Sequence, residues 1–211
     1  MTKLTIIGAA PSNFVWTCRI ACAEKGVEYD LVEARPHTPG VSAIHPLGKI
    51  PVMRHGEVEL FESKAICSYI DRKFPGPGLI PAGAHGAALV EQWVSFVTTS
   101  FDPLCMRQYA LGYFFPGTPD KSPNRAIIDP SVPKLGPMLA IIDRALAATG
   151  FLAGPSFTLA DAFLAPIMHY LSKLPESSAE LARNARLNTW FEQTMARPSV
   201  ASTMPPPPPA R

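Results

Sequence analysis

The chain has 211 residues, enough for one large domain or two smaller ones with a sizeable core. Its hydrophobic fraction of 47% and charged fraction of 17% are typical of a folded globular protein and exclude a disordered chain. The formal net charge is only +2, and no basic stripe with interleaved aromatic residues occurs, so we expect no nucleic-acid partner.

The four cysteines are Cys18, Cys22, Cys67 and Cys105. They form neither a C-x-x-C redox pair nor the dense spacing of a secreted disulfide framework, so we expect reduced thiols in a cytoplasmic protein. The apolar stretch at the start is too short for a signal peptide, and no run of about 18 apolar residues follows. We therefore expect no membrane association. The histidines lack metal-ligand spacing, so we also expect no metal.

The N-terminal part alternates between strand and helix patterns. Residues 3–7 are a short apolar run, which predicts a buried strand. A helical apolar period follows over 14–22, where Ser12 or Asn13 can cap the first turn. Residues 27–31 alternate between apolar and polar, so a second strand is expected beside the first and parallel to it.

Two short apolar runs, 50–54 and 58–61, then predict an antiparallel hairpin, and a helical stripe follows over 65–70. This stripe ends before a Pro- and Gly-containing segment at 74–78. The order of elements matches an α/β thioredoxin-like domain, which we assign to residues 1–75.

Beyond a linker at 76–85, helical stripes dominate, so residues 86–200 are expected to form an all-α helical bundle. Helices are expected at 86–111, which Pro103 should kink or interrupt, and at 134–149, 158–173 and 179–196. Residues 112–133 predict a proline-rich loop, of a length found in lids and binding walls and also in mobile surface loops. The Pro-rich tail, 201–211, is expected to be extended, and we assign it no function.

Two segments suggest a binding site. Pro51 opens a strand, where proline removes a ladder donor; a cis Ile50–Pro51 bond would explain it, and a trans edge-strand proline is the alternative. Glu62 and Ser63 stand where a strand passes into a helix, whose free N–H groups favour a carboxylate. Ser63 adds a hydroxyl and Glu62 can pair with an ammonium, so the two suit an amino-acid head group. Ordinary capping by Ser63 is the alternative.

Together these segments resemble the glutathione S-transferase family. His45-Pro-Leu-Gly-Lys-Ile-Pro-Val52, then Leu60-Phe-Glu-Ser-Lys-Ala-Ile66, looks like that family's glutathione-site signature at the family's spacing. Phe151-Leu-Ala-Gly154 with Thr158-Leu-Ala-Asp161 resembles its capping box, in which Thr158 and Asp161 satisfy each other's backbone N–H groups. Trp190-Phe191 through Ala196-Arg197-Pro198 is also similar. The resemblance covers about residues 3 to 200 and is nearest to cytosolic, serine-type members such as the phi, tau and zeta classes.

The resemblance implies that glutathione is the co-substrate, bound in a cleft between the two domains, and that Ser12 activates its thiol. A hydroxyl donor and the helix dipole lower the pKa of the thiol, so Ser12 is expected to act by hydrogen bonding to the thiolate. Many serine-type relatives carry Arg five residues after the serine, where this chain has Thr17. Asn13 is the second candidate, and capping alone is the alternative for Ser12. Cys18 and Cys22 fall on the apolar helix face, which predicts buried, inert thiols.

By the same resemblance, the backbone of Ile50 should pair with the cysteinyl part of glutathione while Pro51 holds that edge open. Lys49 and His37 should reach the glycine carboxylate, with a solvated surface histidine as the alternative for His37. An apolar electrophile should lie against the helical domain, with core packing as the alternative for each wall residue. This candidate wall comprises Phe14, Phe101, Leu104, Cys105, Tyr109, Phe114 and Phe115.

The expected function is that of a detoxifying glutathione transferase, cytoplasmic and homodimeric, which joins the glutathione thiolate to a largely apolar electrophile. A non-catalytic glutathione- or ligand-binding protein of the same fold is one alternative. Another uses the same thiolate for peroxide reduction, isomerisation or dehalogenation. The sequence leaves these alternatives open.

Overall fold

The computed structural model describes residues 2–206, which form two compact units. The first unit comprises the chain up to Ala82 together with the segment that begins at Arg197, and the second runs from Gly83 to Ala196. No helix in residues 2–206 is long and apolar enough to cross a membrane.

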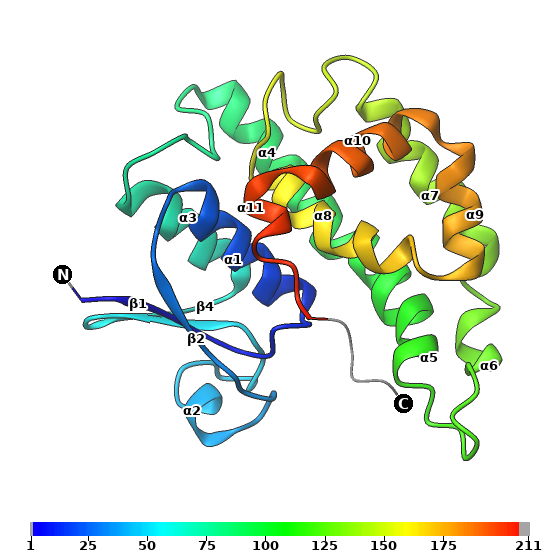
Figure 1. Ribbon diagram of the computed structural model, residues 1–211, viewed down its shortest axis with the longest axis horizontal. Coiled ribbons are helices and arrows are strands. Elements are labelled where there is room, and N and C mark those ends of the chain that lie inside the picture. Colours follow the sequence, from blue (N-terminus) through cyan, green and yellow to red (C-terminus); the bar gives the residue numbers. More distant parts are fainter. Residues whose placement is uncertain (1, 207–211) are drawn as a thin grey trace. The chain divides into compact units, whose positions relative to one another are not determined.

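The first unit is built on a four-stranded mixed sheet in the order β2-β1-β3-β4 (Figure 1). Its strands are β1 (Leu4–Ile7), β2 (Tyr29–Val32), β3 (Val52–His55) and β4 (Val58–Phe61). β1 pairs in parallel with β2, while β3 is antiparallel to both β1 and β4, so the predicted crossover unit and hairpin are confirmed. The register aligns one row of residues across the sheet, namely Val32, Ile7, Val52 and Phe61.

Helices cover both faces of this sheet. α1 (Asn13–Glu24) and α3 (Ser63–Lys73) lie on one face, and the short α2 (Pro39–Ser42) lies on the other (Figure 1). Because side chains alternate along a strand, Ile7 points away from α1 and packs with Val41 of α2. The α/β thioredoxin-like class predicted for the N-terminal part is therefore confirmed.

The C-terminal segment is fastened to α1. Arg197 pairs with Glu24, with 2.5 Å between Nε and Oε1, and Trp16 Nε1 donates to Thr203 Oγ1 at 3.0 Å. Between these contacts the short helix α11 (Pro198–Ala201) packs on α1. The sequence assigned residues up to 200 to the helical bundle, whereas these bonds make the segment from Arg197 part of the first unit. Residues 207–211 of the expected tail lie outside the described residues.

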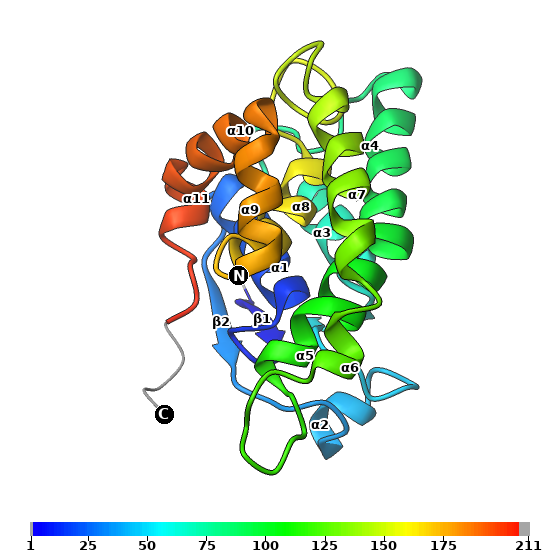
Figure 2. The ribbon, with the colours of Figure 1, turned by 90° about the vertical axis from the view of Figure 1, so that its right-hand side faces the viewer.

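The second unit is all-helical, as predicted (Figure 2). Its elements are α4 (Ala84–Phe96), the π-helices η1 (Val97–Phe101) and η2 (Pro103–Ala110), α5 (Leu111–Phe114), α6 (Arg125–Ile128), α7 (Val132–Ala145), α8 (Leu159–Leu171), α9 (Pro175–Arg183) and α10 (Ala185–Ala196). Every residue of α8 except Tyr170 is buried, so this helix is the core of the unit.

Pro103, expected to kink or interrupt the first long helix, does not end it, because wide π-helical turns on either side accommodate a residue that cannot donate a backbone hydrogen bond. Two details differ from the pattern-based prediction. The single helix expected over 179–196 is two helices, since Asn184 leaves helical geometry at φ −106° and ψ 83°. The loop expected over 112–133 contains the short helix α6.

Candidate functional site

The segments that carry the predicted glutathione site all leave the sheet at one end. Residues 8–12 follow β1, 33–38 follow β2, 62–63 follow β4, and residues 50–51 precede β3. Because β3 runs against β1 and β4, its start lies at the same end as the ends of those strands, as the aligned row requires. Strand register therefore gathers segments that are up to about fifty residues apart in the chain.

Ser12 stands at the N-terminus of α1, half-buried, with extended backbone geometry. Its backbone N–H donates to the carbonyl of Ala9 at 2.9 Å, and its own carbonyl accepts from Trp16 at 2.9 Å. The hydroxyl makes no capping hydrogen bond to the first turn of the helix. The capping-only alternative for Ser12 thus finds no support in the structure.

The neighbours of Ser12 in α1 are occupied inside the unit. Asn13 is 5% exposed, and its backbone carbonyl accepts a hydrogen bond from the Thr17 hydroxyl at 3.0 Å. Thr17 is completely buried. Asn13 is therefore a weaker candidate for contact with a ligand than Ser12, while Phe14 is half-buried.

Gly8 explains how the Ile50–Pro51 segment comes to lie beside α1. A Cβ atom at Gly8 would be 2.6 Å from Val15 Cγ2 and 3.2 Å from Ile50 Cβ, so a side chain would force the helix and the loop apart. The Ile50–Pro51 peptide bond is cis, the state that the sequence analysis considered for it. Ile50 is half-buried and Pro51 is buried.

Glu62 and Ser63 begin α3 in an unusual way. Glu62 is the N-cap residue, with φ 66° and ψ 115°, a left-handed backbone geometry that non-glycine residues rarely adopt. Its side chain makes no capping bond and is exposed. Ser63 is 7% exposed, and its carbonyl accepts a contact from Cys18 Sγ of α1 at 3.8 Å. Ser63 is thus the first helical residue and not the cap that the alternative required.

Lys49 and His37 are both exposed and come from neighbouring loops. The His37 backbone N–H donates to the carbonyl of Gly48 at 2.8 Å, which holds His37 next to the start of the Lys49 segment. A Cβ atom at Gly48 would lie 2.6 Å from His37 Nδ1, so the imidazole itself packs against that loop. The structure therefore brings these two predicted residues together.

One cavity near these segments was missed by the sequence analysis. It has a volume of about 400 Å³ and is lined by Ala9, Glu33, Ala34, Arg35 and Thr38. Glu33 accepts a hydrogen bond from the backbone N–H of Ala10 at 3.1 Å, which ties the segment after β2 to the segment before Ser12. The charged residues Glu33 and Arg35 come directly after a strand, and this placement is the sequence signal that could have identified the cavity.

The candidate wall of the second unit is mostly interior. Phe101, Cys105 and Tyr109 are completely buried and Leu104 is 8% exposed, so these four fit core packing, the alternative that the sequence analysis kept for them. Phe114 is half-buried and stacks edge-on against Tyr170, and Phe115 is 76% exposed. Among the candidate wall residues of this unit, the accessible aromatic rings therefore lie at the end of α5.

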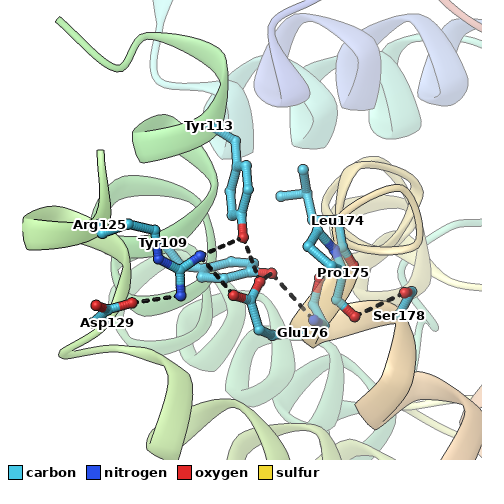
Figure 3. A network of polar contacts seen from close by, with 9 residues as sticks. Tyr109, Tyr113, Arg125, Asp129, Leu174, Pro175, Glu176 and Ser178 are labelled. Carbon is cyan, nitrogen blue, oxygen red and sulfur yellow. Dashed lines mark hydrogen bonds and ion pairs between the residues drawn. The ribbon is translucent and has the colours of Figure 1, made fainter. Parts of the chain in front are cut away.

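Tyr109 belongs to a polar network inside the second unit, in which two tyrosines and an arginine point at one carboxylate (Figure 3). The hydroxyls of Tyr109 and Tyr113 donate to Glu176 Oε2 at 2.9 and 2.5 Å, and Arg125 Nη1 donates to Oε1 at 2.8 Å. Arg125 also pairs with Asp129 at 2.5 Å. The network joins η2, α5 and α6 to the start of α9 and so fixes both ends of the 115–124 loop.

The cysteines are not candidates for nucleophilic chemistry. All four are buried free thiols, and burial raises the pKa of Cys18, Cys22 and Cys105. The thiolate is the reactive form, so burial disfavours reaction at these residues, and the burial that the helix pattern predicted for Cys18 and Cys22 is confirmed. Within the described ranges, no three His, Cys, Asp or Glu side chains are grouped as a metal site would need.

Comparison with known proteins gives matches over nearly the whole chain. Residues 6–78 match the family model of the glutathione S-transferase N-terminal domain, and residues 125–193 match that of the C-terminal domain. Glutathione S-transferase 3 from Zea mays is 31% identical over an alignment of 223 residues, gaps included, and this alignment covers 99% of this chain and 98% of that relative.

Solved structures give the same result. The apo form of glutathione S-transferase III has a TM-score of 0.86 and 32% identity, covering 99% of this chain and 100% of the other. A theta class glutathione S-transferase from the citrus canker pathogen Xanthomonas axonopodis pv. citri, solved with glutathione bound, has a TM-score of 0.87 and 26% identity. That alignment covers 98% of this chain and 99% of the other.

Proposed function

The chain belongs to the glutathione S-transferase family and is a glutathione transferase, and on that basis we propose which of its residues bind glutathione and activate the thiol. The observation that carries the proposal is the common end of the sheet, where the segments of Ser12, Ile50–Pro51 and Glu62–Ser63 meet through strand register. Glutathione is a tripeptide with an ammonium, two carboxylates and one thiol, and each group finds a complementary residue there.

Ser12 stabilises the reactive form of the thiol. Its hydroxyl makes no capping bond and stands at the N-terminus of a twelve-residue helix, so both the O–H group and the helix dipole favour a negative charge on sulfur. The pKa of the bound thiol falls, and the thiolate attacks an electrophilic carbon of the co-substrate. A carbon–sulfur bond forms, and the electron pair of the broken bond leaves with the departing group or enters a conjugated acceptor.

Glu62 and Ser63 hold the amino-acid head group of the γ-glutamyl residue. The exposed Glu62 carboxylate pairs with the ammonium, and the Ser63 hydroxyl and the first N–H groups of α3 donate to the α-carboxylate. The rare backbone geometry of Glu62 supports this assignment, because strained positions concentrate at ligand sites. The backbone of Ile50, next to the cis proline, pairs with the cysteinyl residue, and Lys49 with His37 binds the glycine carboxylate.

The co-substrate is an electrophile with a largely apolar body. Of the six wall residues in the second unit, Phe114 and Phe115 retain accessible aromatic surface, so we assign these two to the co-substrate and leave the buried four to the core. Phe14 of the first unit is half-buried and stays a separate candidate. We further propose a cytoplasmic homodimer, which the family resemblance implies; the four free thiols suit a reducing compartment.

The test is the ultraviolet absorbance of bound glutathione thiolate as a function of pH, compared between the wild type, Ser12→Ala and Ser178→Ala, a half-buried control serine in α9. The proposal requires a thiol pKa well below that of free glutathione in the wild type and in Ser178→Ala, and its loss in Ser12→Ala. Conjugation of a reactive aryl halide should fall about 100-fold or more in Ser12→Ala. Equal rates in wild type and Ser12→Ala would refute the role of the hydroxyl.

A further inference from the structure

A buried histidine lies between the two segments of the glutathione site. His45 precedes the Lys49–Pro51 segment and is 3% exposed. Its ring packs against Phe61, the last residue of β4, with 4.9 Å between the ring centroids. The imidazole therefore contacts the residue directly before Glu62, although the activity proposed above gives His45 no role.

The contacts of the ring fix which nitrogen carries the proton. His45 Nδ1 accepts a hydrogen bond from the backbone N–H of Leu47 at 3.0 Å. A backbone N–H can only donate, so Nδ1 is unprotonated in this contact and the neutral ring carries its proton on Nε2. The donor side of the imidazole is thus the side that faces away from Leu47.

That donor side faces Glu62. The distance from His45 Nε2 to Glu62 Oε1 is 3.7 Å, which is too long for a hydrogen bond. It is short enough for the N–H dipole to attract the carboxylate. The side chain of Glu62 is 66% exposed and makes no bond to the cap of its own helix. Without a neighbour such as His45, an exposed glutamate would be free to populate several rotamers.

We propose that His45 is a positioning residue for glutathione binding, whose Nε2–H orients the Glu62 carboxylate toward the ammonium of the tripeptide. The inference rests on the proposed function, because it needs Glu62 to bind that ammonium. His45 acts through Glu62 and does not touch glutathione. By holding Leu47 with one nitrogen and facing Glu62 with the other, the ring also sets the separation of the two binding segments.

Two substitutions separate the two halves of the ring. In His45→Asn the amide oxygen can take the place of Nδ1 and still accept from Leu47, but nothing replaces the Nε2–H. In His45→Gln the longer side chain carries an N–H group to the place of Nε2 and loses the acceptor. Calorimetry should show glutathione affinity falling about threefold to fivefold in His45→Asn, the range of a partly exposed charge contact, and by less than about twofold in His45→Gln. His85→Asn, at an exposed position in α4, is the matched control and should match the wild type.

A double-mutant cycle distinguishes positioning from a general structural role. If His45 acts through Glu62, His45→Asn should have no further effect on glutathione affinity in a Glu62→Gln background. An equal loss in both backgrounds would overturn the inference. A wild-type protein that binds no glutathione would overturn the proposed function as well, whereas wild-type binding without coupling would overturn the inference alone.

A measurement on the unsubstituted chain keeps the test valid if a His45 variant does not fold. Nitrogen-15 chemical shifts of histidine side chains distinguish the two neutral tautomers. The inference requires the Nε2–H tautomer for His45 and a change in its Nε2 shift in Glu62→Gln. An Nδ1–H tautomer, or an Nε2 shift unaffected by Glu62→Gln, would contradict it.

Discussion

Asp161 is the residue whose removal should destabilise the second unit most clearly. The capping box expected at the start of α8 is present, and Asp161 extends it beyond its own helix. Its Oδ2 accepts from the backbone N–H and the hydroxyl of Thr158 at 3.0 Å each. Its Oδ1 accepts from the backbone N–H of Leu152 at 3.2 Å and from Trp190 Nε1 of α10 at 3.0 Å. One completely buried carboxylate thus joins a loop, α8 and α10.

The cost of Asp161→Ala follows from the donors it leaves behind. The N–H groups of Leu152, Thr158 and Trp190 cannot turn to other partners, and each buried donor without an acceptor costs about 1–3 kcal/mol. Burial raises the pKa of Asp161 more than the hydrogen bonds to its carboxylate lower it. The charged form of the carboxylate is therefore itself costly in this site. Removing the charge recovers part of that cost, so we expect a net loss of about 3 kcal/mol.

Urea unfolding monitored by circular dichroism measures this loss. Asp161→Asn keeps one oxygen for one pair of donors and turns an NH₂ group toward the other pair. Its free energy of unfolding should therefore fall by about half as much as that of Asp161→Ala. Asp120→Ala removes an exposed carboxylate that also accepts from backbone and hydroxyl groups, and it should change stability by less than about 0.5 kcal/mol. A loss below about 1 kcal/mol in Asp161→Ala would refute the reasoning, since three buried donors would then have found other partners.

Three further results are expected. Burial opposes ionisation of Glu176, but hydrogen bonds from Tyr113, Arg125 and Tyr109 outweigh it and hold the pKa of Glu176 at about 2. The stability that the ionised carboxylate contributes is therefore complete above about pH 4.5 and is lost as the pH falls toward 2. Urea unfolding at a series of pH values should show this loss in the wild type but not in Glu176→Gln. Burial and the nearby Lys173 lower the pKa of His169 from 6.5 to about 4, so between these pH values only the unfolded chain protonates this histidine. The free energy of unfolding should therefore fall on acidification over that range in the wild type but not in His169→Gln. Gly8→Ala places a Cβ 2.6 Å from Val15 Cγ2, so it should lower the free energy of unfolding by about 1–3 kcal/mol and weaken glutathione binding in calorimetry. Gly83→Ala, whose Cβ would have no atom within 4 Å, should do neither. Unchanged binding in Gly8→Ala would contradict the close packing of α1 on the Ile50–Pro51 loop.

The order of elements could be predicted because each is marked by its own residues. Alternating and continuous apolar runs identified all four strands to within about two residues, and helical periods identified α1, α3 and α8. The break at Asn184 was missed, since an asparagine inside an apolar period gives no strong breaker signal. The attachment of the segment from Arg197 was missed because Glu24 and Trp16, which hold it, are about 170 to 190 residues away.

The candidate site could be proposed from the sequence where its residues are adjacent, and less so where the assignment depends on burial. Glu62 and Ser63 are adjacent, and a strand passing into a helix is visible in the sequence. Aromatic residues at helical spacing look the same whether they line a wall or fill a core, so Phe101 and Tyr109 could not be separated from Phe115 before their burial was known. His45 stands in the signature segment, but its relation to Glu62 arises from the pairing of Val52 with Phe61.

Thr17 shows how one departure from the family pattern changes the expected mechanism. Where many serine-type relatives have an arginine, this chain has a completely buried threonine whose hydroxyl donates to the carbonyl of Asn13. Position 17 therefore faces the interior of the first unit and brings no positive charge to the first turn of α1. In the proposed mechanism the thiolate then depends on the Ser12 hydroxyl and on the N–H groups of the helix N-terminus, whose field is screened by salt. We accordingly expect the thiol pKa of bound glutathione to rise measurably with ionic strength. An arginine in direct contact with the thiolate would make that pKa less sensitive to salt.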